Sequence, residues 1–372
     1  MADTSVPTAL QVKQWDETFY QQYIQIPDFA SVMGSQSNAV IQVKSQLGKR
    51  RGDTIYLELV NKLTNAAITG SNVLEGNEED MSLRSHSITI DKRRFAVRIP
   101  EMEEIRSAID LREAGRVVLL DKTKEDTRDL LIEALGSLNG TAFLSRTAAI
   151  GDAWLVDNKD RTVFGSYAAG GSAGGTDLSA DLGQLDTTDD LFNVTALDKM
   201  ILAAKTCNPK IRPVSDPGNG KRTYIVYANP HAFKNLRDSI DTEVLANTVV
   251  QAQGMKLFEG GDLYWNGAIV KEVDDIPIYP NIGAGGTAEV TPVYLCGAQA
   301  LGIAWGRRWA TKTKEFDYGD KYGVAADGIY GVSKLRFGTG TTDTDDYKDH
   351  GVVTGFFATT GTATVSSAAE TA

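Results

Sequence analysis

Residues 52–100 contain two long stretches in which apolar and polar side chains alternate. The first carries three large apolar residues on one side of an extended chain, Ile55, Leu57 and Leu59. The second, residues 88–99, changes phase between Ile90 and Phe95, which predicts a bulge or turn at 91–94. Because a period of two residues is typical of half-buried strands, this part of the chain predicts two long β-strands.

The connection between these strands is acidic and polar, and it shows no helical pattern. It includes the run Leu74–Asp80, in which Gly76 and Asn77 favour a turn. A two-stranded ribbon on its own is at best marginally stable in water, because one of its faces has nothing to pack against. We therefore expect a protruding β-arm that another surface must cover.

Residues 1–47 form a second segment that needs a covering surface. They are polar, show no sustained period and carry five scattered aromatic residues, Trp15, Phe19, Tyr20, Tyr23 and Phe29. Large aromatic side chains lose free energy when they remain in water. We expect an extended N-terminal arm that lies against a partner surface.

A long helix is expected after the arm, and a mixed domain later in the chain. The stretch 101–145 contains no proline, and its apolar residues follow helical spacing near Leu135, so we predict one helix over 107–138 that ends before Asn139-Gly140. Residues up to 190 are rich in Gly and Asp and predict loops or short strands. From 195 to 305 helical and strand patterns alternate, with Thr195 as an expected helix cap and Asn229-Pro230 as the start of another helix.

Charge and composition exclude several classes of protein. Lys and Arg number 38 and Asp and Glu number 49, a net charge of −11, which disfavours a sequence-independent nucleic-acid binder. Cys207 and Cys296 have no zinc-type spacing, so we predict neither a metal site nor a disulfide framework. The most apolar run, residues 294–306, is too short to span a bilayer, and the N-terminus lacks the pattern of a signal peptide.

No motif in the sequence supports catalysis. The run 218–222 resembles a phosphate-binding loop, but Arg222 replaces the hydroxyl residue that would hold magnesium, and a strand follows it where a helix should begin. The acidic run 343–346 lacks the glycine of a calcium loop, so a solvated turn explains it better. The histidines at 86, 231 and 350 have no catalytic partners nearby in sequence. We predict no catalytic, cofactor-binding or metal-binding residues.

Two basic triplets give the arm a charge of its own. Residues 48–100 hold nine Lys and Arg residues against seven Asp and Glu residues, whereas the rest of the chain is acidic. The triplets either protect the edges of a solvated ribbon or lie across the acidic surface of a neighbouring copy, and charge alone does not decide between these interpretations. The candidate intersubunit contacts are Lys49, Arg50, Arg51, Glu75, Glu78, Glu79, Lys92, Arg93 and Arg94.

Seven short runs between residues 40 and 355 carry a family resemblance. They are Gln42-Val43-Lys44, Gly52-Asp53-Thr54-Ile55, Leu74-Glu75-Gly76-Asn77-Glu78-Glu79, Ile90-Asp91-Lys92-Arg93-Arg94, Asp110-Leu111-Arg112-Glu113, Tyr227-Ala228-Asn229-Pro230 and Asp349-His350-Gly351-Val352-Val353. In this order, the runs resemble the major capsid proteins of podophage-type tailed phages.

The resemblance implies an α+β fold of the Hong Kong 97 capsid type, with an N-terminal arm, an extended β-loop, a peripheral domain that contains a long spine helix, and an α+β axial domain. Mapped onto this chain, the expected segments are an arm at 1–47, an extended β-loop at 48–100, a peripheral domain with the spine helix and Gly-rich loops at 101–194, an axial domain at 195–305, and return strands of the peripheral domain with a tail at 306–372.

The resemblance also implies a structural role without enzymatic activity or cofactors. Such a subunit self-assembles, as hexamers and pentamers, into the icosahedral shell that encloses the double-stranded DNA of a tailed phage, without sequence-specific DNA binding and without a membrane. Expected partners are scaffolding, portal and decoration proteins, and the expected location is the virion capsid after assembly in the host bacterial cytoplasm. The alternatives are a bacterial nanocompartment shell and a cytoplasmic α+β nucleotide-binding enzyme that uses residues 218–222.

Overall fold

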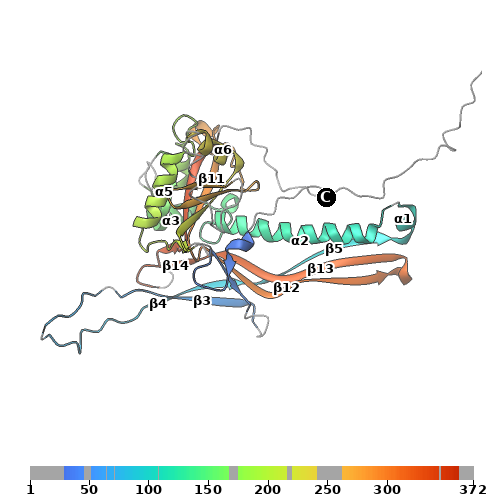
Figure 1. Ribbon diagram of the computed structural model, residues 1–372, viewed down its shortest axis with the longest axis horizontal. Coiled ribbons are helices and arrows are strands. Elements are labelled where there is room, and N and C mark those ends of the chain that lie inside the picture. The colour runs from blue at the N-terminus through green and yellow to red at the C-terminus, as the bar shows by residue number, and fades with distance from the viewer. Residues whose placement is uncertain are drawn as a thin grey trace, which may run out of the picture. The chain divides into compact units, whose positions relative to one another are not determined.

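The computed structural model describes residues 29–45, 52–63, 65–70, 72–107, 109–166, 175–215, 220–240, 262–342 and 345–359. These residues form two compact units (Figure 1). The first unit comprises Lys92–Thr127 and Arg308–Ile329, and the second takes the described parts of 29–91, 128–307 and 330–359. Most of the predicted N-terminal arm and the whole triplet 49–51 lie outside the described residues.

The first unit packs a helix against a three-stranded sheet. The strands are β5 (Asp91–Pro100), β12 (Leu301–Phe316) and β13 (Lys321–Lys334), in the order β12-β13-β5. The helices are α1 (Glu101–Arg106) and α2 (Leu111–Gly136), and the last residues of α2, like parts of β12 and β13, belong to the second unit. Leu119 of α2 forms a small core with Val324 and Ala326.

The long helix predicted over 107–138 is confirmed as α2. It begins at Leu111 because Asp110 caps it: Asp110 Oδ1 accepts hydrogen bonds from the backbone N–H groups of Arg112 (3.0 Å) and Glu113 (3.1 Å). Asn139 and Gly140, predicted to stop the helix, form a turn three residues beyond its end, and both have positive φ values, 50° and 80°.

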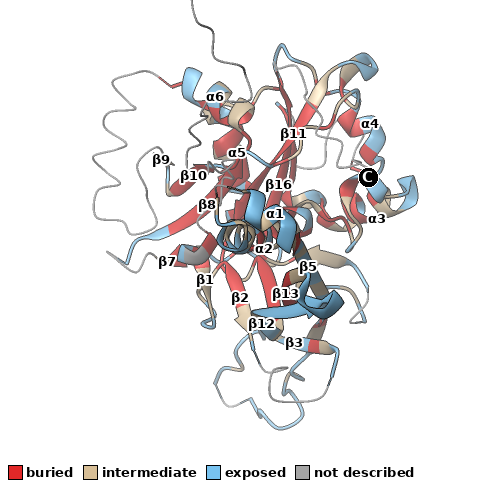
Figure 2. Ribbon diagram, turned by 90° about the vertical axis from the view of Figure 1, so that its right-hand side faces the viewer, coloured by how far each residue is buried: buried red, intermediate tan, exposed pale blue. Residues whose placement is uncertain are grey.

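A larger sheet dominates the second unit. Its strand order is β6-β16-β11-β8-β10-β9, with β7 (Val214–Ser215) paired to β8. The bounds are β6 (Thr162–Phe164), β8 (Arg222–Ala228), β9 (Leu263–Trp265), β10 (Ala268–Glu272), β11 (Glu289–Cys296) and β16 (Val352–Thr359). The central strands β8, β11 and β16 are buried (Figure 2). Phe356 and Phe357, consecutive on β16, belong to two different hydrophobic clusters, so both faces of the sheet are covered.

Four helices supply the side chains that cover this sheet. They are α3 (Ala148–Asn158), α4 (Leu178–Leu182), α5 (Val194–Thr206) and α6 (Pro230–Asp238). Residues of α5 and α6 share one cluster with Phe357, whereas residues of α3 and α4 share the other with Phe356. This arrangement is an α+β fold.

Three expectations are corrected by this unit. Residues 352–359, expected to return to the peripheral domain, pair with β11 from Glu289↔Thr359 to Cys296↔Val352, because β16 is apolar and needs a central position. A helix, α3, occupies 148–158, where loops or short strands were expected. The cap of α5 is Asn193 rather than Thr195, since the Asn193 side chain accepts a hydrogen bond from Ala196 N.

The predicted start of α6 is confirmed, and it yields a stability prediction. Asn229 Oδ1 accepts a hydrogen bond from His231 N (3.0 Å), while its amide donates to the carbonyl oxygen of Ile276 (2.6 Å). Replacing Asn229 with Ala removes both bonds, and we expect it to cost about 1–2 kcal/mol of unfolding free energy. Urea unfolding of the subunit measures this loss. Asn229→Ser, which keeps an N-cap acceptor, should lose less, and equal losses for the two variants would contradict the assignment of the cap.

Short strands complete the second unit. β1 (Met33–Gly34) pairs with β2 (Ile41–Lys44), and β2 runs parallel to the first residues of β12. β3 (Thr54–Val60) pairs with β4 (Leu83–Thr89), and β14 (Arg336–Gly338) pairs with β15 (Tyr347–Asp349). Among the helices that the structure describes, none has the length and apolar character needed to cross a membrane.

A buried polar network ties α3 to β13 and β15. Asp349 Oδ2 accepts hydrogen bonds from Lys334 Nζ (2.8 Å) and Trp154 Nε1 (3.1 Å), and both charged side chains are only 3% exposed. The backbone of Asp349 is also held, because its N–H donates to Asn158 Oδ1 (2.8 Å) and its carbonyl oxygen accepts from Arg161 Nη1 (2.6 Å). The network satisfies groups that would otherwise be costly to bury.

Candidate assembly surface

The strands β3 and β4 form the two-stranded ribbon that the alternating pattern predicted. Their register runs from Thr54↔Thr89 to Val60↔Leu83, and Asn61 N donates to Ser82 O (3.1 Å) just beyond the paired strands. The partner of β3 therefore ends at Thr89. The break between β4 and β5 falls at Ile90, and the alternation of exposure changes phase at 91–92, within the predicted 91–94. From there β5 continues in a different sheet.

One face of the ribbon is anchored at its base. Ile55 and Ile88, directly opposite each other, share a small buried core with Ala304, Leu335 and Phe337. A Cβ atom at Gly302 would lie 2.5 Å from Ile88 Cδ1, so this close approach requires a glycine. The core holds the base of the ribbon but contains few residues.

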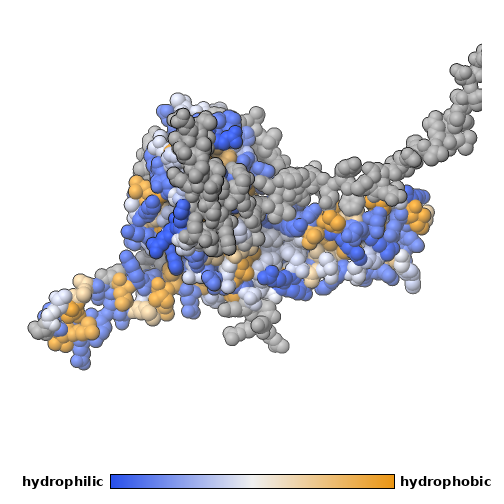
Figure 3. Space-filling model, viewed as in Figure 1, coloured by the Kyte–Doolittle hydropathy of each residue, from blue (hydrophilic) through white to orange (hydrophobic). Residues whose placement is uncertain are grey.

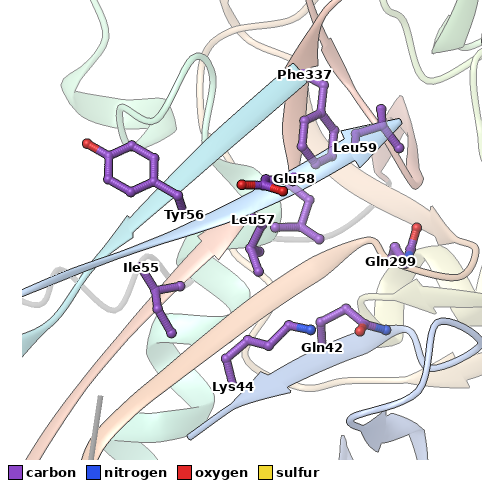
Figure 4. A pocket seen from close by; sticks show the side chains of 10 residues that line it. Gln42, Lys44, Ile55, Tyr56, Leu57, Glu58, Leu59, Gln299 and Phe337 are labelled. Atoms are coloured by element: carbon purple, nitrogen blue, oxygen red, sulfur yellow. The ribbon is translucent and has the colours of Figure 1, made fainter. Parts of the chain in front are cut away.

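A cavity of about 240 Å³ lies beside β3 (Figure 4). Leu57, Leu59 and Phe337 contribute apolar walls, whereas Lys44 and Glu58 are the two charged residues of the lining. Gln42, Tyr56 and Gln299 complete its polar part, and the lining contains no His, no Cys and no pair of carboxylates of the kind that carries acid–base or nucleophilic chemistry. The cavity is instead a gap in the packing under the ribbon.

The ribbon and the loop beyond it expose an unusual amount of apolar side chain (Figure 3). Seven large hydrophobic residues are more than half exposed: Tyr56, Val60, Leu63, Val73, Leu74, Met81 and Leu83. Contiguous exposed apolar side chains mark an interaction surface. The ribbon is therefore the first candidate for contact with another molecule.

The acidic candidates lie in the loop between β3 and β4. Glu75 and Glu78 are exposed and Glu79 is partly exposed, and two of them organise the loop through backbone N–H groups. Glu78 Oε2 accepts a hydrogen bond from Gly76 N, and Glu79 Oε2 accepts one from Asn65 N, both at 2.7 Å. The loop thus presents a negative surface.

The basic candidates Lys92, Arg93 and Arg94 lie on β5, in the first unit. Arg93 Nη1 forms an ion pair with Asp126 Oδ1 of α2 at 2.7 Å, so this guanidinium serves the packing of its own unit. Lys92 and Arg94 are exposed and, by strand alternation, point to the opposite face. The predicted basic and acidic residues therefore belong to different units, and Lys49, Arg50 and Arg51 lie outside the described residues.

The described ribbon is acidic, not basic. Residues 52–91 contain seven acidic residues, and only Lys62 and Arg84 are basic. The prediction of a basic arm on an acidic neighbour counted the basic residues of β5 as part of the ribbon. In the structure, β5 pairs with β13 instead. Exposure alternates along β5, so Arg98, which was not among the predicted contacts, lies on the same face as Arg94.

The other candidate sites were a phosphate-binding loop and a cluster of metal ligands. Residues 218 and 219 of the loop that resembles a phosphate-binding motif lie outside the described residues, and Arg222 begins β8, so a strand follows the loop. In the described part of the chain, no group of three or more His, Cys, Asp and Glu side chains is arranged to hold a metal ion.

Two of the three histidines meet at the base of the ribbon. The rings of His86 and His350 approach Phe337 edge-on, with ring centroids 6.2 Å and 5.2 Å from that of Phe337. His86 Nε2 lies 3.0 Å from Ser333 Oγ. Nearby Asp349 is bonded to Lys334 and Trp154, so these groups do not form a catalytic triad.

Burial makes these histidines a source of acid sensitivity. It lowers the pKa of both imidazoles to about 4, with further lowering from Arg336 at His86 and from Arg161 at His350, while Asp349 opposes the shift at His86. The unfolded chain takes up protons near its ordinary pKa of 6.5, whereas the folded chain does not. The contribution of these neutral histidines to the free energy of unfolding is therefore fully present above pH 6.5. It is lost as the pH falls toward 4, by up to about 3 kcal/mol for His86.

The test is the pH dependence of unfolding. His86→Gln retains a hydrogen-bonding group for Ser333 but no longer titrates, so we expect its stability to fall less than that of the wild type between pH 6.5 and 4. His231→Gln, at the start of α6, is the matched control. Parallel profiles for His86→Gln and the wild type would contradict the prediction.

The chain matches phage shell proteins over most of its length. Residues 3–355 match the family described as phage capsid protein. The major capsid protein of Pseudomonas phage KPP25 is 28% identical over 346 residues, which cover 87% of this chain and 89% of that protein. The structure in the capsid asymmetric unit of cyanophage Pam1 superposes with a TM-score of 0.83 at 30% identity, covering 97% of this chain and 100% of that one. The capsid of Ralstonia phage GP4 gives 0.76 at 22% identity, with 96% and 97% covered.

Proposed function

Because the chain belongs to the phage capsid protein family, we propose that its β3–β4 ribbon is a contact between subunits of the shell. The chain is a phage major capsid protein, and its subunits assemble into the capsid of the virion. The α+β fold of the Hong Kong 97 capsid type, expected from the resemblance, is confirmed. The nanocompartment shell and the nucleotide-binding enzyme find no support in these matches.

The exposed ribbon is the observation that supports this contact. Its outward side chains include Tyr56, Val60 and Leu83, each more than half exposed, and the loop adds further apolar residues. A two-stranded ribbon is marginal in water, and covering its apolar side chains stabilises it by about 25 cal/mol for each Å² removed from water. A neighbouring copy supplies that cover in a shell, where the same contact repeats around each ring.

The proposed role in the shell also involves other copies of the chain and other proteins of the particle. Copies of the chain assemble as hexamers and pentamers in the host bacterial cytoplasm, and scaffolding, portal and decoration proteins complete the particle. The role is structural rather than enzymatic. The net charge of −11 suits a wall that encloses DNA without binding it in a sequence-specific way.

Expression of the chain alone tests the proposed function. Negative-stain electron microscopy and sedimentation of the purified protein should show closed, hollow particles of uniform size. Particles that contain one co-purified enzyme would favour the nanocompartment. Stable single chains of 40.2 kDa that gain thermal stability from nucleotides would overturn the proposal in favour of the enzyme.

A further inference from the structure

Alternate residues of β4 attach the ribbon to the rest of the second unit, which we call the body. Arg84 Nη2 donates a hydrogen bond to the carbonyl oxygen of Gly340 (2.6 Å). His86 Nε2 lies 3.0 Å from Ser333 Oγ, and Ile88 belongs to the small core at the base of the ribbon. Because consecutive side chains of a strand alternate, these three residues of β4 point to one face. On this face the attachment consists of one apolar side chain and two polar contacts.

The base of the ribbon lies directly against the backbone of the body at two glycines. A Cβ atom at Gly302 of β12 would lie 2.5 Å from Ile88 Cδ1, and a Cβ atom at Gly331 of β13 would collide with the carbonyl oxygen of Thr89. Beside this close approach, the cavity of about 240 Å³ leaves the apolar side of β3 incompletely packed (Figure 4). The ribbon is therefore fitted closely at its base and supported loosely along β3.

His86 is the attachment residue whose charge can change in mildly acidic solution. It is only 8% exposed. Two cations lie close to it: Arg84 shares its face of β4, and Arg336 of β14 acts on it electrostatically. Asp349 favours a protonated His86, but this carboxylate is already bound by Lys334 Nζ at 2.8 Å. The site is therefore unfavourable for an additional positive charge.

The other elements around His86 do not neutralise such a charge. On β3 the residue directly opposite is Leu57. Across Phe337 stands the second buried histidine, His350, which is itself under the influence of the guanidinium of Arg161. Lys44 and Glu58, one of each sign, line the adjacent cavity. Within the part of the chain that the structure describes, Asp349 is the one carboxylate that raises the pKa of His86.

We propose that His86 is an acid-sensitive switch: when it takes up a proton, β3 and β4 leave the body while the seven-stranded sheet stays folded. In the released state the imidazolium reaches water, where its charge is hydrated. A two-stranded ribbon without support is marginal, so its backbone hydrogen bonds then open to solvent. This switch belongs to the single subunit and goes beyond the contact between subunits.

The direction of the switch follows from proton linkage. Burial, the largest effect, and Arg336 lower the pKa of His86 to about 4 in the attached state, whereas a solvated histidine titrates near 6.5. Between these two values the released state binds the proton and the attached state does not. A fall in pH therefore shifts the population toward the released state. Above pH 6.5 the ribbon stays attached.

Amide hydrogen exchange of the full chain, held as unassembled subunits, tests the switch because it reports opening strand by strand. After correction for the intrinsic exchange rate, the opening of β3 and β4 should increase about 50-fold between pH 7 and pH 4.5. Over the same exposure time β11 and β16 should remain protected. Low concentrations of urea should change the exchange of the ribbon little, since a local opening exposes less surface than global unfolding.

Two variants identify the group that is titrated. His86→Gln retains a hydrogen-bonding group for Ser333 but takes up no proton, so the opening of its ribbon should vary by less than about threefold over this pH range. His231→Gln, at the start of α6, is the matched control and should respond as the wild type does. If His86→Gln does not fold, the comparison of the ribbon with β11 and β16 in the wild type still decides the question.

Exchange that rises with acid in the ribbon of the wild type, but not in that of His86→Gln, supports the switch. Equal protection of β4 and β11 at pH 4.5 overturns it. Simultaneous exchange of all strands also overturns it, because that result is global unfolding. An acid response that persists in His86→Gln overturns it as well, since another group would then be titrated. The measurement uses single subunits, so none of these outcomes depends on shell formation.

Discussion

Shells are expected not to form when residues 62–81 are replaced by a two-residue Asn-Gly turn. Asn61 N and Ser82 O already lie 3.1 Å apart, so a tight turn can join them without disturbing β3 or β4. The change removes the acidic loop and four of the exposed apolar residues, Leu63, Val73, Leu74 and Met81. Sedimentation and negative-stain microscopy of the purified variant measure the loss of particles.

The unassembled variant should remain folded. The small core under Ile55 and Ile88 and the larger sheet lie outside the replaced segment, so urea unfolding should stay cooperative with a midpoint close to that of unassembled wild-type subunits. A matched control replaces the four apolar residues with serine at full loop length, and an intermediate yield is expected. Particles of normal size and number from the shortened chain would sink the claim that the ribbon joins subunits.

Asp349→Ala is expected to cause the largest loss of stability among single substitutions. It leaves Lys334, only 3% exposed, without its carboxylate and removes the acceptor of the Trp154 indole. Breaking one partner of a buried ion pair costs about 3–5 kcal/mol. Urea unfolding measures this loss, and a marginally stable subunit would be recovered mainly as aggregate.

A second variant keeps this prediction testable if Asp349→Ala does not fold. Lys334→Met combined with Asp349→Leu removes both charges and fills the space, so its stability should exceed that of Asp349→Ala by about 2 kcal/mol or more. Asp189→Ala, an exposed acid in a loop, is the control and should change little. Equal stability of Asp349→Ala and the wild type would show that the network contributes nothing.

Elements with strong local signals were predictable from sequence. Helix α6 has Asn229-Pro230 at its start, and α2 has no proline and carries apolar residues at helical spacing near its end, Leu131, Ala134 and Leu135. Helix α3 was missed because Trp154 and Leu155, consecutive residues, are both fully buried, which blurs the one-sided pattern of an amphipathic helix. Gly151 within it also disfavours a helix by propensity. Its packing against the sheet overrides that local preference.

Long-range pairing limited the prediction of the assembly surface. The alternating pattern identified the ribbon and its exposed character, but it could not show that β5 leaves β4 and pairs with β13, more than 220 positions later. Without the basic residues of β5, the net charge of the ribbon is negative rather than positive. The pairing of His86 and His350 around Phe337 is equally invisible in sequence, because only the fold brings β4 and β14 together.

Electron cryomicroscopy of shells assembled from the wild-type chain tests the central claim most directly. At a resolution that traces side chains, residues 63–83 of each subunit should lie on another copy. Density that instead places this loop in solvent, or against its own subunit, would contradict the account.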